Sequence, residues 1–355
     1  MIGILKQKLR ALVLTLFQKA RSTEELILAA NKASNEYKAV RDSIANAPNP
    51  YHESRPKAPD RYIENTSKPP PIFITGRFRS GSTLLWNLMR ETSNITAYYE
   101  PFNERRWFAQ SQRGDHTDRS HRGVADYWAE YRDQEALSHL YNEDWIRRDL
   151  YMDKAHFDPG MKQYIQALIN NSKDRAALQF NRVDFRLEWL TYNFPQALII
   201  HIYRNPRDQW CSFLGDMSIY PSECEDHTVF QDHFYLRVWY RDLCRQFPFL
   251  VSYESSHQYY LFYFIWKLSY LYGTLYSTRS ICYEDLVQSS EATVRQLLTV
   301  INEPDYQIGH LVDIIDRKAA SKWGGYATDS WFTEIELECE SVIDEFFNTK
   351  AGPHA

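Results

Sequence analysis

The amino-acid sequence predicts an α/β protein with three layers, in which a mostly parallel central sheet lies between helices. From residue 72 onward, short apolar runs alternate with stretches of helical periodicity. The order strand, helix, strand indicates a parallel sheet flanked by helices. The chain has 355 residues, of which 44% are hydrophobic and 25% are charged. These proportions are typical of a globular protein and exclude a disordered chain, a collagen and a coiled coil.

The net charge bears on the kind of ligand that the protein binds, and the cysteines bear on its compartment and on metal binding. The formal net charge is −5, from 41 basic and 46 acidic residues, whereas proteins that bind nucleic acid usually carry a basic excess. We therefore expect no nucleic-acid partner, although an anionic small ligand needs only a few local cations. The five cysteines include no C-x-x-C pair and indicate neither a disulfide framework nor a zinc site. We expect a reducing compartment, the cytoplasm, and no metal.

The first 47 residues are expected to form a helical extension. Residues 1–21 hold five basic residues and no acidic one, around an apolar run at 11–17 that is too short to cross a bilayer. Such a basic amphipathic helix either lies peripherally on a membrane surface, docks a partner or packs on its own protein. A capping box at Ser22 opens a second helix, and the proline-rich residues 48–71 read as an extended connector.

The chemistry is expected in one domain, residues 72–345, which is followed by a tail at 346–355. Strands are predicted at residues 72–75, 95–99, 178–181, 197–203 and 280–283, and helices at 83–92, 185–193 and 291–300. An insert at about 104–176 is polar and expected to be helical. Residues 253–276 carry aromatic side chains on all faces of one predicted helix, which indicates a core helix.

A glycine-containing loop follows the first predicted strand and opens the next helix. Its pattern from Gly76 to Thr83 is G-x-x-x-x-G-S-T, which has the glycine spacing of a P-loop but has Ser82 in place of the lysine. Backbone N–H groups at such a helix start bind phosphate, and Arg79 adds a guanidinium that can contact two oxygens. The predicted phosphate ligands are Arg77, Arg79, Ser80, Gly81, Ser82 and Thr83. The alternative is a Gly-Ser turn that only caps a helix.

Residues 78–85 resemble the 5′-phosphosulfate loop of the sulfotransferases that use 3′-phosphoadenosine 5′-phosphosulfate (PAPS). The carbohydrate, bacterial and tyrosylprotein branches of that family often have an arginine at the position of Arg79. The resemblance covers residues 70 to about 335. It implies a P-loop-like sulfotransferase fold, PAPS as sulfuryl donor, 3′,5′-adenosine bisphosphate (PAP) as product and no required metal. It also implies an acceptor with a hydroxyl group, such as a carbohydrate or a small-molecule or lipid-linked alcohol.

Two later segments resemble the contacts that this family makes to the 3′-phosphate. Arg204 ends the fourth predicted strand in the pattern R-N-P-R-D, and Ser212 lies eight residues further on. A guanidinium and a helix-start hydroxyl can converge on one phosphate, although a surface arginine and a capping serine are the alternative. Arg317 and Lys318 resemble the family's R-K-G element, with Ala319 in place of its glycine.

Glu100 is the predicted general base, because sulfuryl transfer to a hydroxyl requires a group that takes its proton. Glu100 follows the strand predicted at 95–99, and its surroundings are aromatic; flat rings there could stack on an adenine, a sugar or a phenol. The resemblance agrees, because many sulfotransferases with an arginine-type loop have a catalytic glutamate here, often as E-P-F. Arg79 is predicted to stabilise charge on the leaving phosphate. The alternative is a structural Glu100 paired with Arg105 or Arg106.

Arg182 and a polar cluster around Asp118 are interpreted as structural rather than as ligands of substrate or metal. Arg182 follows a strand end and could contact acceptor or donor, but a salt network with Asp184 is the favoured interpretation. Asp118 and His121 belong to a polar cluster that is expected to be solvated rather than to bind metal.

Two other functions stay open. A kinase would use the same P-loop-like turn, but the pattern lacks the lysine and an evident metal-binding carboxylate. A non-catalytic member of the fold would bind a nucleotide or a partner, but damaged phosphate motifs would then be expected.

Overall fold

The computed structural model describes Tyr51 and residues 69–348 apart from 115, 116, 119, 120, 122, 305 and 317–320. The expected N-terminal extension, most of the connector, Arg317, Lys318 and the end of the tail lie outside the described residues.

Within the described residues, five parallel strands form one sheet in the order β2-β3-β1-β4-β5. The strands are β1 (Ile72–Thr75), β2 (Ile95–Tyr99), β3 (Arg175–Phe180), β4 (Leu198–Tyr203) and β5 (Arg279–Cys282). In the central strand, Ile72 pairs with Ala177 on one side and with Leu198 on the other. All four residues of β1 are buried, as expected for a parallel strand with helices on both faces. The predicted α/β class is confirmed.

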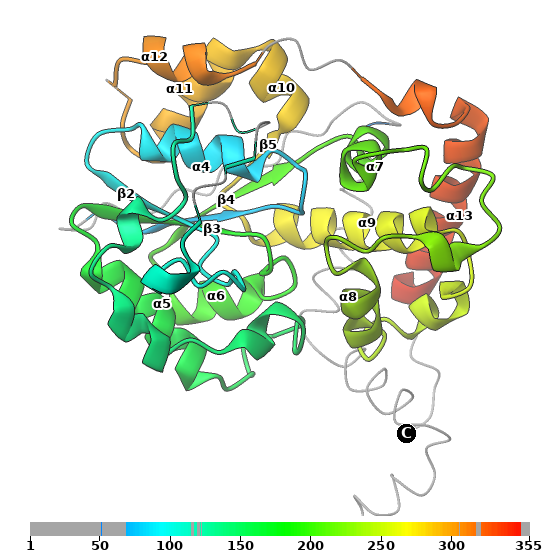
Figure 1. Ribbon diagram of the computed structural model, residues 1–355, viewed down its shortest axis with the longest axis horizontal. Coiled ribbons are helices and arrows are strands. Elements are labelled where there is room, and N and C mark those ends of the chain that lie inside the picture. The colour runs from blue at the N-terminus through cyan, green and yellow to red at the C-terminus, as the bar shows by residue number, and fades with distance from the viewer. Residues whose placement is uncertain are drawn as a thin grey trace, which may run out of the picture.

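Helices cover the sheet. They are α4 (Ser82–Arg90), α5 (Pro159–Asn171), α6 (Leu187–Asn193), α7 (Pro206–Leu214), α8 (Leu236–Leu243), α9 (Gln258–Tyr276), α10 (Tyr283–Gln288), α11 (Ser290–Val300), α12 (Gly309–Ile314) and α13 (Asp329–Asn348). Figure 1 shows α4 with α10, α11 and α12 above the sheet and α5 and α6 below it, while α7, α8, α9 and α13 form the right-hand part of the view. Short 3-10 helices lie at η5 (His227–Val229), η6 (Pro248–Tyr253) and η7 (Trp323–Gly325).

The segment between β2 and β3 is less helical than expected. Its described residues hold one α-helix, α5, and short 3-10 helices at η1 (Gln110–Gln112), η2 (Ala129–Tyr131), η3 (Glu135–His139) and η4 (Glu143–Ile146). Side chains instead satisfy much of its backbone. Arg113, for example, donates to the carbonyl oxygens of Trp107, Phe108 and Tyr131. A polar side chain of this segment thus bonds loop carbonyl groups, which need donors when buried.

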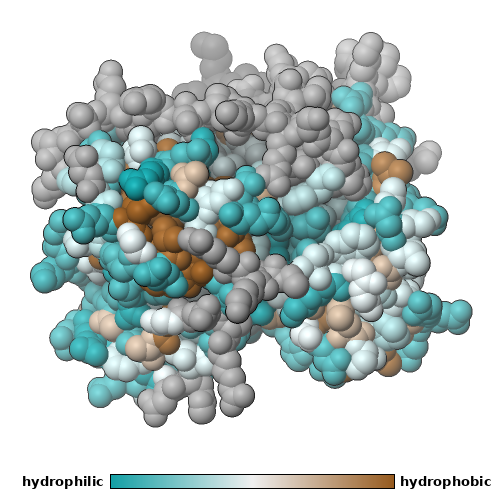
Figure 2. Space-filling model, turned by 90° about the horizontal axis from the view of Figure 1, so that it is seen from above, coloured by the Kyte–Doolittle hydropathy of each residue, from teal (hydrophilic) through white to brown (hydrophobic). Residues whose placement is uncertain are grey.

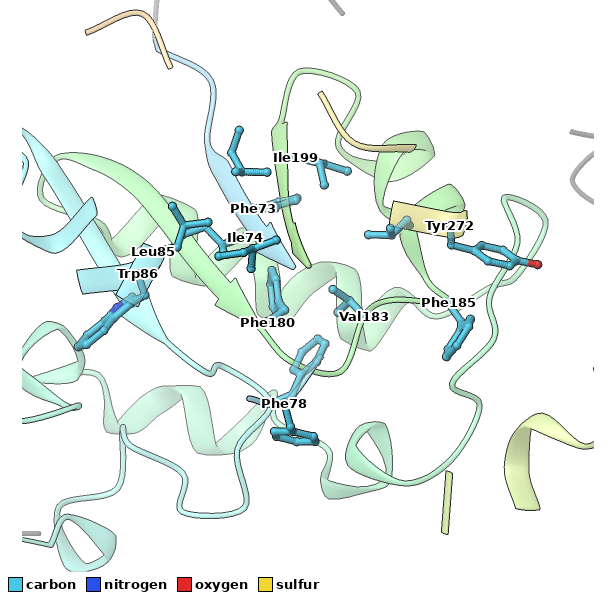
Figure 3. Close-up of a cluster of buried hydrophobic side chains, with 14 of the residues drawn as sticks. Phe73, Ile74, Phe78, Leu85, Trp86, Phe180, Val183, Phe185, Ile199 and Tyr272 are labelled. Carbon is cyan, nitrogen blue, oxygen red and sulfur yellow. The ribbon is translucent and has the colours of Figure 1, made fainter. Parts of the chain in front are cut away.

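Aromatic side chains fill the core around the sheet. Phe73 of β1 packs edge-on against Phe180 of β3, with ring centroids 5.7 Å apart, and Figure 3 shows both beside Ile74 and Ile199. Most of α9 is buried, which confirms the predicted core helix. The face drawn in Figure 2 is mostly hydrophilic, with one main patch of hydrophobic residues. In the described part of the chain, no helix is long and apolar enough to cross a membrane.

Candidate functional site

A cavity of about 1260 Å³ lies beyond the carboxyl ends of β1, β2, β3 and β4, the edge at which open parallel sheets bind ligands. The predicted site residues that line it are Arg79, Gly81, Ser82, Thr83, Glu100, Arg204 and Ser212. They come from the β1–α4 loop, the end of β2, the end of β4 and helix α7. The sheet therefore brings together segments that are far apart in the sequence.

Two glycines shape the loop between β1 and α4. A Cβ on Gly76 would come within 2.7 Å of the Ile202 carbonyl oxygen on β4. Gly81 has a φ of 98°, which side chains disfavour, and a Cβ there would overlap the Tyr283 ring. Ser80 between them is fully buried, and its Oγ has no hydrogen-bond partner among the described residues. The loop backbone thus lies close against its neighbours, with a hydroxyl group left unsatisfied.

The two predicted phosphate motifs meet at this cavity. Arg79 donates from Nε to Ser212 Oγ over 3.0 Å, and Arg204 donates to the Arg79 carbonyl oxygen over 3.3 Å. The Arg204 guanidinium lies 4.7 Å from the centre of the Tyr283 ring, and its buried Nε has no hydrogen-bond partner within the described chain. Arg79 also forms an ion pair with Asp118 at 3.3 Å. Two guanidinium groups and a hydroxyl group therefore lie together, a donor set suited to an anion.

Glu100 lines the cavity directly after β2 and is only 6% exposed. Its carboxylate accepts hydrogen bonds from the side-chain amides of Asn103 and Asn181 and pairs with Arg182 at 3.3 Å. Its backbone N–H donates to Gln179 Oε1 over 3.2 Å. These partners surround Glu100 because β2 and β3 are adjacent in the sheet and end at the same edge.

Neither Arg105 nor Arg106, the two arginines expected to pair with a purely structural Glu100, is its partner in the structure. Arg105 lies over the Trp107 ring, 5.9 Å from its centre. Arg106 instead forms an ion pair with Glu143 at 2.7 Å. Glu100 therefore has a cationic partner, but this partner, Arg182, comes from the loop that follows β3 rather than from the turn next to Glu100.

Arg77 and Arg182 differ from their predicted places. Arg77, expected at the phosphate site, does not line the cavity but is buried and pairs with Asp184 at 3.5 Å. Thr75, two residues earlier, donates to the same carboxylate, because alternate residues of an extended chain face the same side. Burial raises the pKa of Asp184, and the Arg77 guanidinium opposes that rise. Arg182, expected to pair with Asp184, faces Glu100 instead.

Lys322 is a cavity-lining cation that the sequence analysis missed. Asp208 in the first turn of α7 accepts hydrogen bonds from the Lys322 backbone N–H at 2.6 Å and from Ser321 Oγ at 3.1 Å. The preceding Arg207 forms an ion pair with Glu336 of α13 at 2.9 Å. The start of α7 thus holds the C-terminal segment against the cavity. Loop spacing alone does not tell which residues of a loop border a cavity, so no sequence signal singled out Lys322.

Among the described histidines, one lies in the core of the sheet and two line the cavity. His201 on β4 is buried as expected, and burial lowers its pKa to about 3, so the folded protein holds it neutral near pH 7. His121 and His233 line the cavity, as does Asp118, which is exposed there. The part of the predicted polar cluster that the structure describes therefore borders the cavity. His121 Nδ1 lies 2.5 Å from the Tyr127 hydroxyl, and burial lowers its pKa. In the parts of the chain described, no group of three or more His, Cys, Asp or Glu side chains is arranged to hold a metal ion.

Comparisons with known proteins agree with the family that the motifs resemble. A model of the sulfotransferase family matches residues 70–263 of this chain. No curated protein sequence gave a match. The solved structures that are similar include the sulfotransferase domain from the curacin biosynthetic pathway, with 16% identity and a TM-score of 0.40 over 77% of this chain and 98% of that chain.

Two further similar structures come from named bacteria. A sulfotransferase from Mycobacterium avium has 14% identity and a TM-score of 0.40 over 84% of this chain and 78% of that chain. A sulfotransferase from Alicyclobacillus acidocaldarius has 12% identity and a TM-score of 0.37 over 78% of this chain and 95% of that chain. These likenesses are distant, so the assignment of a family rests on the match over residues 70–263.

Proposed function

The chain belongs to the sulfotransferase family, and we propose that it transfers the sulfuryl group of PAPS to a hydroxyl group of an acceptor. One observation carries the proposal: Arg79, the pair of Arg204 and Ser212, and Glu100 line a single cavity. The first two supply cations and a hydroxyl group for an anionic donor, and the third supplies a carboxylate for the acceptor. The acceptor classes proposed are a carbohydrate and a small-molecule or lipid-linked alcohol.

The donor side of the cavity fits a ligand with anionic groups. Arg204 lines the cavity, whereas the predicted ligand Ser80 is buried in the adjoining loop and does not line it. Arg204 Nε and Ser80 Oγ are both buried and have no hydrogen-bond partners among the described residues. Leaving a buried polar atom unpaired is unfavourable unless a ligand or water supplies a partner. Arg79, the backbone N–H groups of its loop and the hydroxyl groups of Ser82 and Thr83 are the proposed contacts to the phosphosulfate. Arg204 and Ser212 are the proposed contacts to the 3′-phosphate.

Three of the predicted donor ligands, Arg77, Arg317 and Lys318, do not line the described cavity. Arg77 is left out of the proposed donor site, because Asp184 engages its guanidinium in the core. Arg317 and Lys318 lie outside the described residues and stay proposed contacts to the 3′-phosphate on the strength of the family resemblance. Lys322, which lines the same cavity, joins them as a cation on the donor side.

In the proposed reaction, PAPS supplies the sulfuryl group. Glu100 accepts the proton of the acceptor hydroxyl, while the hydroxyl oxygen forms a bond to sulfur and the bond between sulfur and the phosphate oxygen breaks. Arg79 and the loop N–H groups offset the negative charge that grows on that phosphate oxygen. The proton leaves Glu100 for solvent before the next turnover. The cavity contributes by holding the hydroxyl and the leaving group on opposite sides of sulfur.

Ligand-dependent thermal stabilisation tests the donor. A ligand at 100 times its Kd adds about 2.7 kcal/mol to the free energy of unfolding, so PAP is expected to raise the Tm clearly. ATP with Mg²⁺ is the control. Stabilisation by ATP with Mg²⁺ and none by PAP would refute the proposal and favour the kinase alternative.

Transfer itself separates an enzyme from a non-catalytic member of the fold. Labelled PAPS is incubated with the full chain and with panels of carbohydrate and lipid-linked alcohols, and labelled product is measured. Label on an acceptor is the expected result. Stabilisation by PAP without transfer to any hydroxyl panel would support a nucleotide-binding protein without this activity.

A further inference from the structure

Arg182 is held more firmly than a residue at the edge of a ligand cavity needs to be. Its side chain is 2% exposed and forms ion pairs with Glu100 at 3.3 Å and with Glu104 at 3.0 Å. The guanidinium also lies 5.1 Å from the centre of the Phe78 ring and 5.7 Å from that of Tyr235. Two carboxylates and two aromatic rings thus fix its position.

The contacts of Arg182 complement those of its neighbour in the chain. Asn181 donates to Oε1 of Glu100, while Arg182 donates to Oε2. Asn103, from the turn after Glu100, also donates to Oε2. Two consecutive residues directly after β3 therefore bind the two oxygens of one carboxylate and fix the plane of that group.

The backbone at Glu100 explains why such fixing is needed. Glu100 has a φ of 39°, in the left-handed region that side chains disfavour. Its backbone N–H is satisfied by Gln179 of β3, so the turn is held from the same strand that holds the carboxylate. Such a backbone conformation persists only where the surrounding structure determines it, and here the contacts to the Glu100 backbone and carboxylate do so together.

We infer that Arg182 is a positioning residue that holds the Glu100 carboxylate in the orientation needed to take the acceptor proton. The inference rests on the proposed function, in which Glu100 is the base. Arg182 lines the cavity, and its buried Nε has no hydrogen-bond partner among the described residues. Both terminal nitrogens of its guanidinium, however, are engaged by Glu100 and Glu104. It therefore affects the reaction through Glu100. A residue that binds PAPS would instead change the affinity of the protein for PAPS.

The test compares Arg182→Met and Arg182→Lys with the wild type. Misplacing a catalytic group by about 1 Å can reduce the rate by about 100-fold, so Arg182→Met should lower kcat by roughly that factor. The KM for PAPS and the Kd for PAP should stay within about twofold, and Arg182→Lys should recover part of kcat. Arg106→Met removes an exposed arginine that pairs with Glu143 and is the matched control with wild-type turnover.

A double-mutant cycle gives a readout that does not depend on activity. Glu100→Gln, Arg182→Met and the double variant are compared by Tm, because contacting residues give non-additive changes. A clear non-additive change, with the kcat loss above, supports the inference. Additive changes in Tm, unchanged kcat in Arg182→Met, or a PAP Kd that rises in step with the loss of kcat would each overturn it.

The two proposals fail in different ways. If the wild type neither binds PAP nor transfers a sulfuryl group, the proposed function is refuted and the role of Arg182 falls with it. If the wild type is active and Arg182→Met matches it in kcat, only the role of Arg182 is overturned.

Discussion

The two ends of the cavity are built in different ways. The end that we propose to bind phosphate, called here the phosphate end, comes from two short segments, residues 76–83 and 204–212, and each contains its own polar groups. The Glu100 end comes from the ends of two strands, where Glu100 and its partner Asn181 are 81 residues apart in the sequence. A local turn can thus specify contacts to an anion, whereas the surroundings of the carboxylate depend on the pairing of β2 with β3.

Removing the carboxylate should have the largest effect and should affect only its own end of the cavity. General-base catalysis contributes about 10²- to 10⁴-fold, so Glu100→Gln should lower kcat by roughly 1000-fold. The Kd for PAP should stay unchanged, because the phosphate end is intact. Labelled transfer and thermal shift with PAP measure the two effects. Glu143→Gln is a control, since its carboxylate pairs with the exposed Arg106, and retained turnover in Glu100→Gln would remove Glu100 as the base.

Arg204→Ala should give the reverse pattern. A hydrogen bond to a charged group contributes about 1.5–3 kcal/mol, so the Kd for PAP should rise by about 10- to 100-fold. At saturating donor, much of kcat should survive because Glu100 is untouched. The comparison variant is Arg295→Ala, which removes an exposed arginine paired with Glu291 on α11. An unchanged Kd in Arg204→Ala would count against its phosphate role.

His201, on the strand that leads to Arg204, should make the free energy of unfolding fall at acid pH. His201 on β4 has a folded pKa of about 3, below the value of about 6.5 for an unfolded chain. Above pH 6.5 both states are neutral at this residue and it has no effect. As the pH falls from 6.5 towards 3, the unfolded state binds a proton that the folded state does not, so stability is lost. At pH 5 the loss is about 2 kcal/mol.

Urea unfolding at pH 7.5 and pH 5 measures this loss. His201→Gln should show a decrease smaller by about that amount, whereas His139→Gln, at an exposed position, should behave as the wild type. An equal decrease in His201→Gln and the wild type would show that His201 does not remain neutral in the fold.

Lys322 should have the smallest effect. Its side chain is exposed, and exposed ion pairs contribute about 0.2–1 kcal/mol. Lys322→Ala should therefore raise the Kd for PAP by at most about fivefold, and more at low salt than at high salt. Lys162→Ala on α5 is the matched control. A change of 100-fold or more would mean that the phosphate end extends further into the C-terminal segment than its local motifs indicate.

The errors of the sequence analysis lie where distant segments meet. The glycine spacing from Gly76 to Gly81 predicted the loop, because both positions require a close backbone approach. The pairing of Arg182 with Asp184 was expected from their nearness in sequence, but Asp184 is bound by Thr75 at the end of β1 and by Arg77 in the loop after it. Sequence nearness favours pairs within one segment, whereas the sheet offers partners from its neighbouring strands.

The sequence by itself determined the α/β class, the position of every strand to within three residues, and the two local motifs at the phosphate end. It could do so because periodicity, glycine spacing and strand-to-helix turns depend on residues close in the chain. The tertiary structure decided that Arg77 is buried in the core, that Lys322 borders the cavity, and that Asn181 and Arg182 contact Glu100. Those outcomes depend on which strands lie side by side and on which buried carboxylate needs a cation. Both are set by contacts between residues far apart in the sequence, so no single segment predicts them.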